Sequence, residues 1–171
     1  VMAREQARDL WQIPNDCLAV GVPGRLTYQK GQDWLLKALT RLDLNRLGVR
    51  VYFCGTGPEE SALRRLGESL GLGPFICWLG HVPNLARCLR AFDLVALPSR
   101  YEGLSYALLE TLSSGVPAVV SDIPAHFPHE AARSQLPAAP VDDAQALANA
   151  ISALVSDGDR RGKIAAWGPK F

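Results

Sequence analysis

Residues 94–122, which read LVALPSRYEGLSYALLETLSSGVPAVVSD, decide the fold of this chain. Residues 94–99 and 117–122 are short, nearly continuous apolar runs, which are typical of strands that are buried on both faces. Between them, residues 104–114 have the apolar spacing of a helix, and Gly115 can close that helix because glycine adopts a left-handed conformation readily. The segment therefore predicts a strand, a helix and a second strand parallel to the first.

The same alternation continues along most of the chain. Further strands are expected at residues 18–23, 49–55, 75–80 and, with a weaker pattern, 135–140, and further helices at residues 32–42, 58–70, 84–91 and 144–155. Pro58 and Asn84 are placed to begin two of these helices, and Asp142 and Asp143 precede another. The pattern predicts an α/β fold with a Rossmann-like, doubly wound, mostly parallel sheet of six strands.

The length of the chain, 171 residues, suits a single hydrophobic core. We expect residues 1–16 to form a leading helix and linker, with the helix at residues 2–11, and residues 17–171 to form one Rossmann-like domain. Helical patterns lie close to both ends of the chain, which favours a fragment of a longer protein.

Composition argues against several functional classes. Charged residues make up 20% of the chain, the formal net charge is +1, and no basic stripe of the kind that binds nucleic acid is present. No stretch approaches the roughly 20 apolar residues that span a bilayer, and no signal peptide is recognisable, so we expect a cytoplasmic domain. The cysteines contain no CxxC pair and are expected to be reduced and without metal: Cys17, Cys54, Cys77 and Cys88.

The loop after the first expected strand carries two cations. It reads GRLTYQKG over residues 24–31, so that Gly24, Arg25 and Lys30 lie together at the carboxyl end of a strand, where parallel sheets bind ligands. Arginine and lysine beside a helix terminus can neutralise a diphosphate, while the glycine lets the backbone approach it. The alternative is that Arg25 and Lys30 are ordinary loop charges. The order of residues does not match a Walker A loop.

The loop after the second expected strand, residues 55–60, reads GTGPEE. It begins like a dinucleotide-binding fingerprint but lacks the third glycine, and Pro58 suits the first position of a helix better. A nicotinamide site is therefore not expected here.

Glu102 and Glu110 follow the fourth expected strand. Glu102 is expected in the loop, and Glu110 about two turns into the next helix, where it could accept hydrogen bonds from two sugar hydroxyls. The amides of Gly103, Leu104 and Ser105 would point at phosphate from the helix N-terminus. The alternative for Glu110 is an exposed glutamate on the polar face of its helix.

The chain has three histidines, His81, His126 and His129. None of them has a serine or cysteine partner in the arrangement of a nucleophile elbow. Surface or packing roles are the preferred interpretation of these side chains.

Four motifs together resemble a known family. They are GRLTYQKG (24–31), CGTGPEESALRRLGESLGL (54–72), WLGHV (78–82) and FDLVALPSRYEGLSYALLETLSSGVPAVVSD (92–122). In order and spacing they resemble the C-terminal, donor-binding domain of GT-B-fold glycosyltransferases of family 4, and the resemblance covers about residues 18–156.

The resemblance implies roles for individual residues. Arg25 and Lys30 match the pair that binds the donor diphosphate, and Glu102 and Glu110 match the two glutamates of the E-x7-E motif. Glu102 would lie beside the transferred sugar and the phosphates, and Glu110 would bind the ribose. The catalytic residues implied are thus Arg25, Lys30 and Glu102.

Backbone groups complete the implied donor site. Amides that approach the sugar and diphosphate in the family match the backbone of Gly103, Leu104 and Ser105. The segment that contacts the base matches the backbone of His81 and Val82. Leu104 and Ser105 stand where many members have Phe and Gly, which leaves the donor sugar open.

The resemblance also implies a reaction and its partners. The enzymes transfer a sugar from a UDP-, GDP- or ADP-sugar to an acceptor hydroxyl with retention of configuration, without a metal or another cofactor, often in bacterial polysaccharide, lipopolysaccharide or glycolipid synthesis. An N-terminal domain of the same chain would supply the carbohydrate or glycolipid acceptor site and any peripheral contact with the inner face of the membrane. The donor-binding half alone would be inactive.

Two other functions stay open at this point. One is a non-catalytic module that binds a nucleotide sugar. The other is a sugar-nucleotide epimerase of GT-B architecture, which would need no acceptor.

Overall fold

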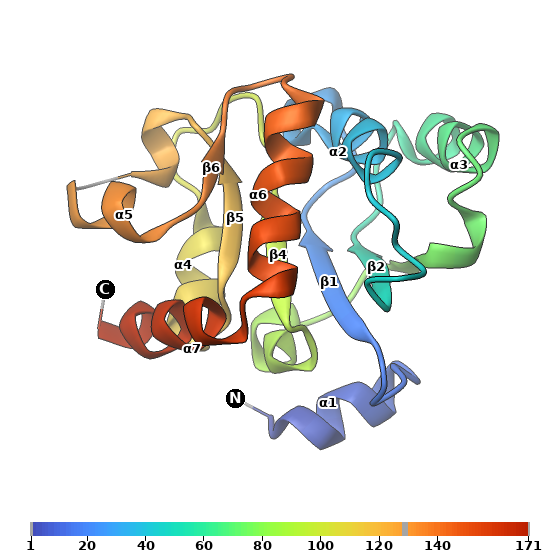
Figure 1. Cartoon of the computed structure of the whole chain (residues 1–171). Coiled ribbons are helices and arrows are strands. Elements are labelled where there is room, and N and C mark those ends of the chain that lie inside the picture. Colours follow the sequence, from blue (N-terminus) through green and yellow to red (C-terminus); the bar gives the residue numbers. More distant parts are fainter. Residues whose placement is uncertain (1, 128–129, 171) are drawn as a thin grey trace.

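The computed structural model describes residues 2–127 and 130–170. A six-stranded sheet forms its centre, in the order β3-β2-β1-β4-β5-β6, and every neighbouring pair of strands is parallel (Figure 1). The strands are β1 (Leu18–Pro23), β2 (Val49–Cys54), β3 (Ile76–Gly80), β4 (Leu94–Leu97), β5 (Ala118–Ser121) and β6 (Ala138–Ala139). The predicted Rossmann-like, doubly wound sheet is confirmed, and its strands are all parallel.

Helices cover both faces of the sheet. They are α1 (Arg4–Leu10), α2 (Gln32–Leu39), α3 (Glu60–Ser69), α4 (Tyr106–Ser113), α5 (Glu130–Gln135), α6 (Ala144–Ser156) and α7 (Gly158–Trp167). The α2 helix packs beside α3 and α6, whereas α4 lies on the opposite face of the sheet (Figure 1). Right-handed crossovers require this arrangement, because the chain moves in one direction from β1 to β3 and in the other from β4 to β6.

The hydrophobic core explains why the strands are continuously apolar. Every residue of β4 and β5 is buried, as is every residue of β1 after Leu18. A β-carbon at Gly21 in β1 would lie only 2.4 Å from the ring of Phe92, so this central strand needs glycine at that position. The leading helix is tied to the same core by Arg8, which is 2% exposed and pairs with Asp93 at 3.2 Å.

Several predicted helix boundaries are confirmed. The carboxylate of Asp143 accepts a hydrogen bond from the Ala146 amide at 2.9 Å and caps α6. Gly115 is left-handed with φ 69° just after α4, as expected of a residue that closes a helix.

Other boundaries were predicted wrongly. Residues 84–91 form two short 3-10 helices, η3 (Leu85–Arg87) and η4 (Leu89–Ala91), in place of one α-helix. Asn84 precedes them in a left-handed conformation, φ 52°, which asparagine tolerates, and its side chain makes no cap. The α3 helix begins at Glu60, two residues after Pro58, and the short helix α5 was not predicted.

Two further findings concern the whole described part of the chain. None of the helices in residues 2–127 and 130–170 is both long and apolar enough to cross a membrane. All four cysteines are free, and burial raises the pKa of the Cys54 thiol to about 12, so that this side chain packs as a small apolar group.

Candidate functional site

The carboxyl ends of the strands form one edge of the sheet, and the loops that follow β1 and β2 are held together there. The amide of Leu26 donates to the carbonyl of Thr56 at 3.0 Å. A β-carbon at Gly55 would lie 2.0 Å from the carbonyl oxygen of Gly24, and one at Gly57 would lie 2.2 Å from that of Leu26. The two glycines of the GTG sequence therefore allow the two loops to touch, which accounts for them without a dinucleotide.

A pocket of about 330 Å³ opens at this edge. It is lined by Gly24, Arg25, Cys54, Gly55, Thr56, His81 and Val82. Residues 24 and 25 were predicted for the diphosphate and residues 81 and 82 for the base, and the pocket brings these four together. The Arg25 side chain is exposed and has no hydrogen-bond or ion-pair partner among the described residues, so its charge is available to a ligand.

Lys30 connects this pocket to Glu102. Its Nζ lies 2.9 Å from Glu102 Oε1, and its aliphatic stem crosses Gly24, so that a β-carbon there would lie 3.5 Å from Lys30 Cε. Lys30 ends η1 (Tyr28–Lys30), and Glu102 follows β4, the strand next to β1. The order of strands thus joins two residues that are 72 positions apart in the chain.

Glu102 is a buried carboxylate that is kept ionised. Its side chain is 5% exposed, and its Oε1 accepts a hydrogen bond from Ser99 Oγ at 2.5 Å. Burial by itself would raise the pKa of Glu102, but the nearby His126 ring and the hydrogen bonds from Ser99 and Lys30 lower it to about 2. The carboxylate is therefore charged at neutral pH despite its burial.

His126 is a site residue that the sequence did not reveal. It is fully buried, its Nε2 lies 3.9 Å from Glu102 Oε1, and it ends η5 (Pro124–His126) just after β5. A packing role was expected, and the side chain does pack, but it packs against the site. Its position after a strand at the carboxyl edge was the available signal. His129 lies outside the described residues.

The segment from Gly103 to Ser105 precedes α4 rather than lying within it. The helix begins at Tyr106, with Ser105 at the N-cap position. The amides of Gly103, Leu104 and Ser105 donate to no acceptor in the part of the chain that the structure covers, and the buried Ser105 hydroxyl has no partner there either. Free amides and a free hydroxyl at a helix start can receive an anion.

Glu110 is exposed and forms no hydrogen bond or ion pair with the described residues of this cluster. It is the fifth residue of α4, so it lies just over one turn into the helix, and the expected two turns were wrong because the helix starts late. No described residue forms an ion pair or hydrogen bond with its carboxylate. Its exposure agrees with both interpretations of the sequence, a carboxylate that binds sugar hydroxyls and an ordinary exposed glutamate.

A second ion-pair cluster braces the edge, and it centres on Arg100. The guanidinium donates to both oxygens of Asp33 at 2.8 and 2.9 Å, pairs with Asp142 at 2.7 Å, and donates to the carbonyl of Tyr28 at 2.7 Å. It also lies over the Tyr28 ring, 4.0 Å from the centroid. Hydrogen bonding to Asp33 raises the pKa of Arg100. The cluster fixes the loop after β4 against α2 and the start of α6.

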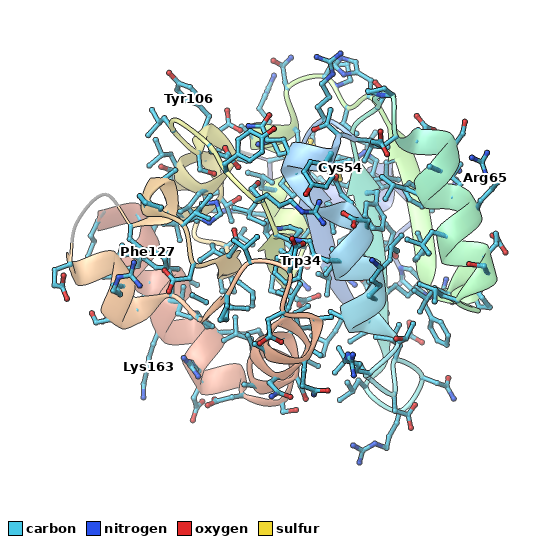
Figure 2. All side chains as sticks on the ribbon, turned by 90° about the horizontal axis from the view of Figure 1, so that it is seen from above. Trp34, Cys54, Arg65, Tyr106, Phe127 and Lys163 are labelled. Carbon is cyan, nitrogen blue, oxygen red and sulfur yellow. The ribbon has the colours of Figure 1, made fainter. Side chains whose placement is uncertain are left out.

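Large apolar side chains are exposed around the same edge. Tyr28, Tyr101, Leu104 and Tyr106 are between 47% and 69% exposed. Figure 2 looks down on this edge, and Tyr106 projects from its rim. In contrast, no group of three or more potential metal ligands occurs among the described residues.

Comparisons with known proteins agree with the fold and show the family. A family model described as "Glycosyl transferases group 1" matches residues 18–157. D-inositol 3-phosphate glycosyltransferase of Corynebacterium urealyticum is 33% identical over 98% of this chain and 42% of its own length. The lipopolysaccharide core biosynthesis mannosyltransferase LpsB of Rhizobium meliloti is 31% identical over 87% of this chain and 44% of its own. The chain thus spans less than half the length of these curated relatives.

Solved structures share the fold at lower identity. HepE of Anabaena, crystallised with UDP and glucose, has a TM-score of 0.84 and 22% identity, with 99% of this chain and 47% of that chain covered. The C-terminal domain of the group 1 glycosyltransferase LpcC of Francisella tularensis has a TM-score of 0.84 and 21% identity, with 99% and 91% covered. The fold is that of one domain of a GT-B glycosyltransferase. On the strength of the match to residues 18–157, this chain belongs to the family of glycosyl transferases group 1.

Proposed function

We propose that this chain is the donor-binding part of a retaining, metal-independent glycosyltransferase of family 4, which transfers a sugar from a nucleotide sugar to an acceptor hydroxyl. The observation that carries the proposal is the Lys30–Glu102 pair beside the pocket of Arg25, His81 and Val82. Cations for a diphosphate, a carboxylate for a sugar and a pocket for a base lie side by side on one edge of the sheet.

Arg25 and Lys30 would bind the diphosphate of the donor. The Arg25 guanidinium has no partner among the described residues, and the side chain of Lys30, which is 20% exposed, packs over Gly24 beside the pocket. The amides of residues 103–105 and the Ser105 hydroxyl, which have no partner among the described residues, would add neutral donors. Such donors stabilise a leaving diphosphate electrostatically.

Glu102 and Glu110 would bind hydroxyl groups of the donor. Ser99 and Lys30 occupy Oε1 of Glu102, whereas its Oε2 has no partner among the described residues and can accept from a sugar hydroxyl. The exposed Glu110 carboxylate has no partner among the described residues, so both of its oxygens would accept from the two ribose hydroxyls. Backbone groups of His81 and Val82 would meet the base.

The proposed reaction exchanges one bond at the anomeric carbon for another. The bond from that carbon to the diphosphate oxygen breaks, the acceptor oxygen bonds to the same face, and the acceptor proton passes to the leaving phosphate. Arg25 and Lys30 neutralise the charge that develops on that phosphate. An acceptor site would be supplied by the N-terminal half of a longer chain.

The relatives that act on inositol phosphate and in lipopolysaccharide core biosynthesis suggest a bacterial glycolipid or polysaccharide pathway.

Ligand-dependent thermal stability tests the proposal. UDP, GDP and ADP are each added to the chain at millimolar concentration, and one of them should raise the melting temperature, since a ligand at 100 times its Kd adds about 2.7 kcal/mol. Arg25→Ala should reduce that rise. Arg65→Ala, which removes an equally exposed cation from the α3 helix (Figure 2), is the matched control and should not. If none of the three nucleotides raises the melting temperature, the chain is not a donor-binding domain.

A further inference from the structure

Three side chains point to a single carboxylate oxygen of Glu102, Oε1, at unequal distances. Ser99 Oγ lies 2.5 Å and Lys30 Nζ 2.9 Å from Oε1, which are hydrogen-bond distances. His126 Nε2 lies 3.9 Å from the same oxygen, which is too long for a direct hydrogen bond. His126 is therefore aimed at the carboxylate without yet bonding to it.

The other ring nitrogen fixes how His126 is protonated. Nδ1 lies 2.9 Å from the carbonyl oxygen of Ser121, and because a carbonyl only accepts, Nδ1 must carry a proton. Ser121 is itself anchored, since its hydroxyl donates to the carbonyl of Ser99. Nε2 is completely buried and has no hydrogen-bond partner in the described part of the chain. A buried polar atom without a partner is rare, and it calls for an explanation.

Lys30 has two competing partners once the proposed function is accepted. It pairs with Glu102 in this structure, yet it is also the cation that would bind the diphosphate beside Gly24. Lysine carries its charge on a flexible stem with three donors and can move between such partners. When Lys30 turns to the diphosphate, Glu102, whose side chain is 5% exposed in this structure, loses a cation.

We propose that His126 is a positioning residue, which replaces Lys30 as the partner of Glu102 when a nucleotide sugar binds and so keeps the carboxylate ionised and aimed at the sugar. The inference rests on the proposed function. To donate from Nε2 while Nδ1 still donates to Ser121, the ring must take up one proton from solvent and become an imidazolium. Imidazole is the side chain that changes charge between about pH 5 and 8.

The surrounding charges favour this exchange. The incoming diphosphate adds negative charge beside Lys30 and Arg25, which offsets the new charge on His126. Two charged groups of the adjoining segments are already paired and do not compete for His126: Arg100 with Asp33 and Asp142, and Asp122 with Arg133.

Two substitutions separate the two hydrogen bonds of His126. His126→Gln places a donor near the position of Nε2, so it can reach Glu102 without taking up a proton. His126→Asn places its amide near the position of Nδ1, so it can keep the bond to Ser121 but cannot reach Glu102. The pair is matched, because both variants replace the ring by an amide.

Calorimetric titration of the three proteins provides the test. The chain is titrated separately with three nucleotide sugars, UDP-glucose, UDP-N-acetylglucosamine and GDP-mannose, and with the matching nucleoside diphosphates. Each titration is repeated near neutral pH in buffers of different ionisation enthalpy, which gives the number of protons taken up on binding. The wild type should take up a proton with the nucleotide sugar. His126→Asn should lose about tenfold or more in affinity for the nucleotide sugar, because it lacks one charge-assisted hydrogen bond. Its affinity for the diphosphate alone should change little. His126→Gln should keep most of the affinity and lose the proton uptake.

The other outcomes overturn the inference in distinguishable ways. If the wild type binds none of the ligands, the proposed function fails and the inference falls with it. If the wild type binds without proton uptake, or if Asn retains affinity better than Gln, the proposed function stands and His126 serves only to hold Ser121.

A measurement on the wild type alone guards against variants that do not fold. The chain has only three histidines, so their ring nitrogens can be resolved by ¹⁵N NMR. Both nitrogens of His126 should show the shifts of an imidazolium when the nucleotide sugar is added. If they remain those of a neutral ring at ligand saturation, the inference is wrong.

Discussion

Two ion-pair clusters join the loops after β1 and β4, and they are built for different purposes. In the first cluster, the Arg100 guanidinium donates to both oxygens of Asp33 and forms an ion pair with the Asp142 carboxylate. It also donates to the carbonyl of Tyr28 and lies over the ring of that residue. Around Glu102, one oxygen is crowded and the other has no partner in the described chain. The Arg100 cluster is saturated, whereas the Glu102 cluster keeps capacity for a ligand.

The chemistry of the two cations explains this difference. Arginine has a rigid planar fork that is well suited to a fixed pair of carboxylates, and lysine has a point charge that can change partner. In these two clusters, arginine (Arg100) stands where the loops are held together, and lysine (Lys30) stands where, under the proposed function, a ligand would compete. Charge at the edge of the sheet is thus divided between support and binding.

The largest effect on stability should come from breaking the Arg100 cluster. Arg100→Met leaves Asp33 partly buried without its partner and frees the loop after β4. We expect the free energy of unfolding to fall by about 2 to 3 kcal/mol, less than for a fully buried pair because Asp33 and Asp142 are 31% and 51% exposed. Urea denaturation measures this loss. A fall below about 0.5 kcal/mol, the size seen for exposed pairs, would remove the distinction between the clusters.

The largest effect on binding should come from Glu102→Gln. The amide has nearly the same shape, but it lacks the charge that pairs with Lys30 and accepts from a sugar hydroxyl. We expect the affinity for a nucleotide sugar to fall by about ten- to hundredfold, with a much smaller change for the nucleoside diphosphate. Isothermal titration of both ligands checks this. Equal losses for the two ligands would place Glu102 at the phosphates instead of the sugar.

Acid should affect stability through Glu102, because its pKa is lowered to about 2 in the folded chain. A carboxylate with a depressed pKa contributes stability above its unfolded pKa, and this contribution is lost as the pH falls toward the folded value. Between pH 5 and pH 3 the wild type should therefore lose about 1 to 2 kcal/mol that Glu102→Gln does not lose. Urea unfolding at the two pH values gives the difference. Parallel losses in both proteins would show that Glu102 is not held ionised by its neighbours.

The strands were predictable from sequence, and the contacts between loops were not. Residues 18–23 form β1 as expected, because burial on both faces demands a continuous apolar run that is visible locally. Arg25, Lys30 and Glu102 were predicted as site residues because their loops follow strands and because they match motifs of the family that the chain resembles. That Lys30 touches Glu102 depends on β4 lying next to β1, which no local pattern specifies.

The helix starts and His126 show where local patterns fail. Helix α4 begins at Tyr106 instead of residue 104, since Ser105 takes the N-cap position, and this places Glu110 about half a turn closer to the start of the helix. His126 has no neighbouring residues that mark it as part of a site. Its role depends on a hydrogen bond to Ser121 and on the position of Glu102 across two strands.

The smallest effect on stability, and the clearest separation of binding from support, should come from Glu110→Ala. The carboxylate is exposed and has no partner among the described residues, so the free energy of unfolding should change by no more than about 0.5 kcal/mol. If Glu110 binds the ribose, however, the variant should lose about tenfold in affinity for the nucleoside diphosphate, the cost of charge-assisted hydrogen bonds. Thermal unfolding with and without the nucleotide measures both quantities in one experiment. Glu59→Ala, which removes an exposed glutamate at the start of α3, is the control for loss of charge alone. Equal affinities for the two variants would make Glu110 an ordinary surface residue and would confine the site to the loops.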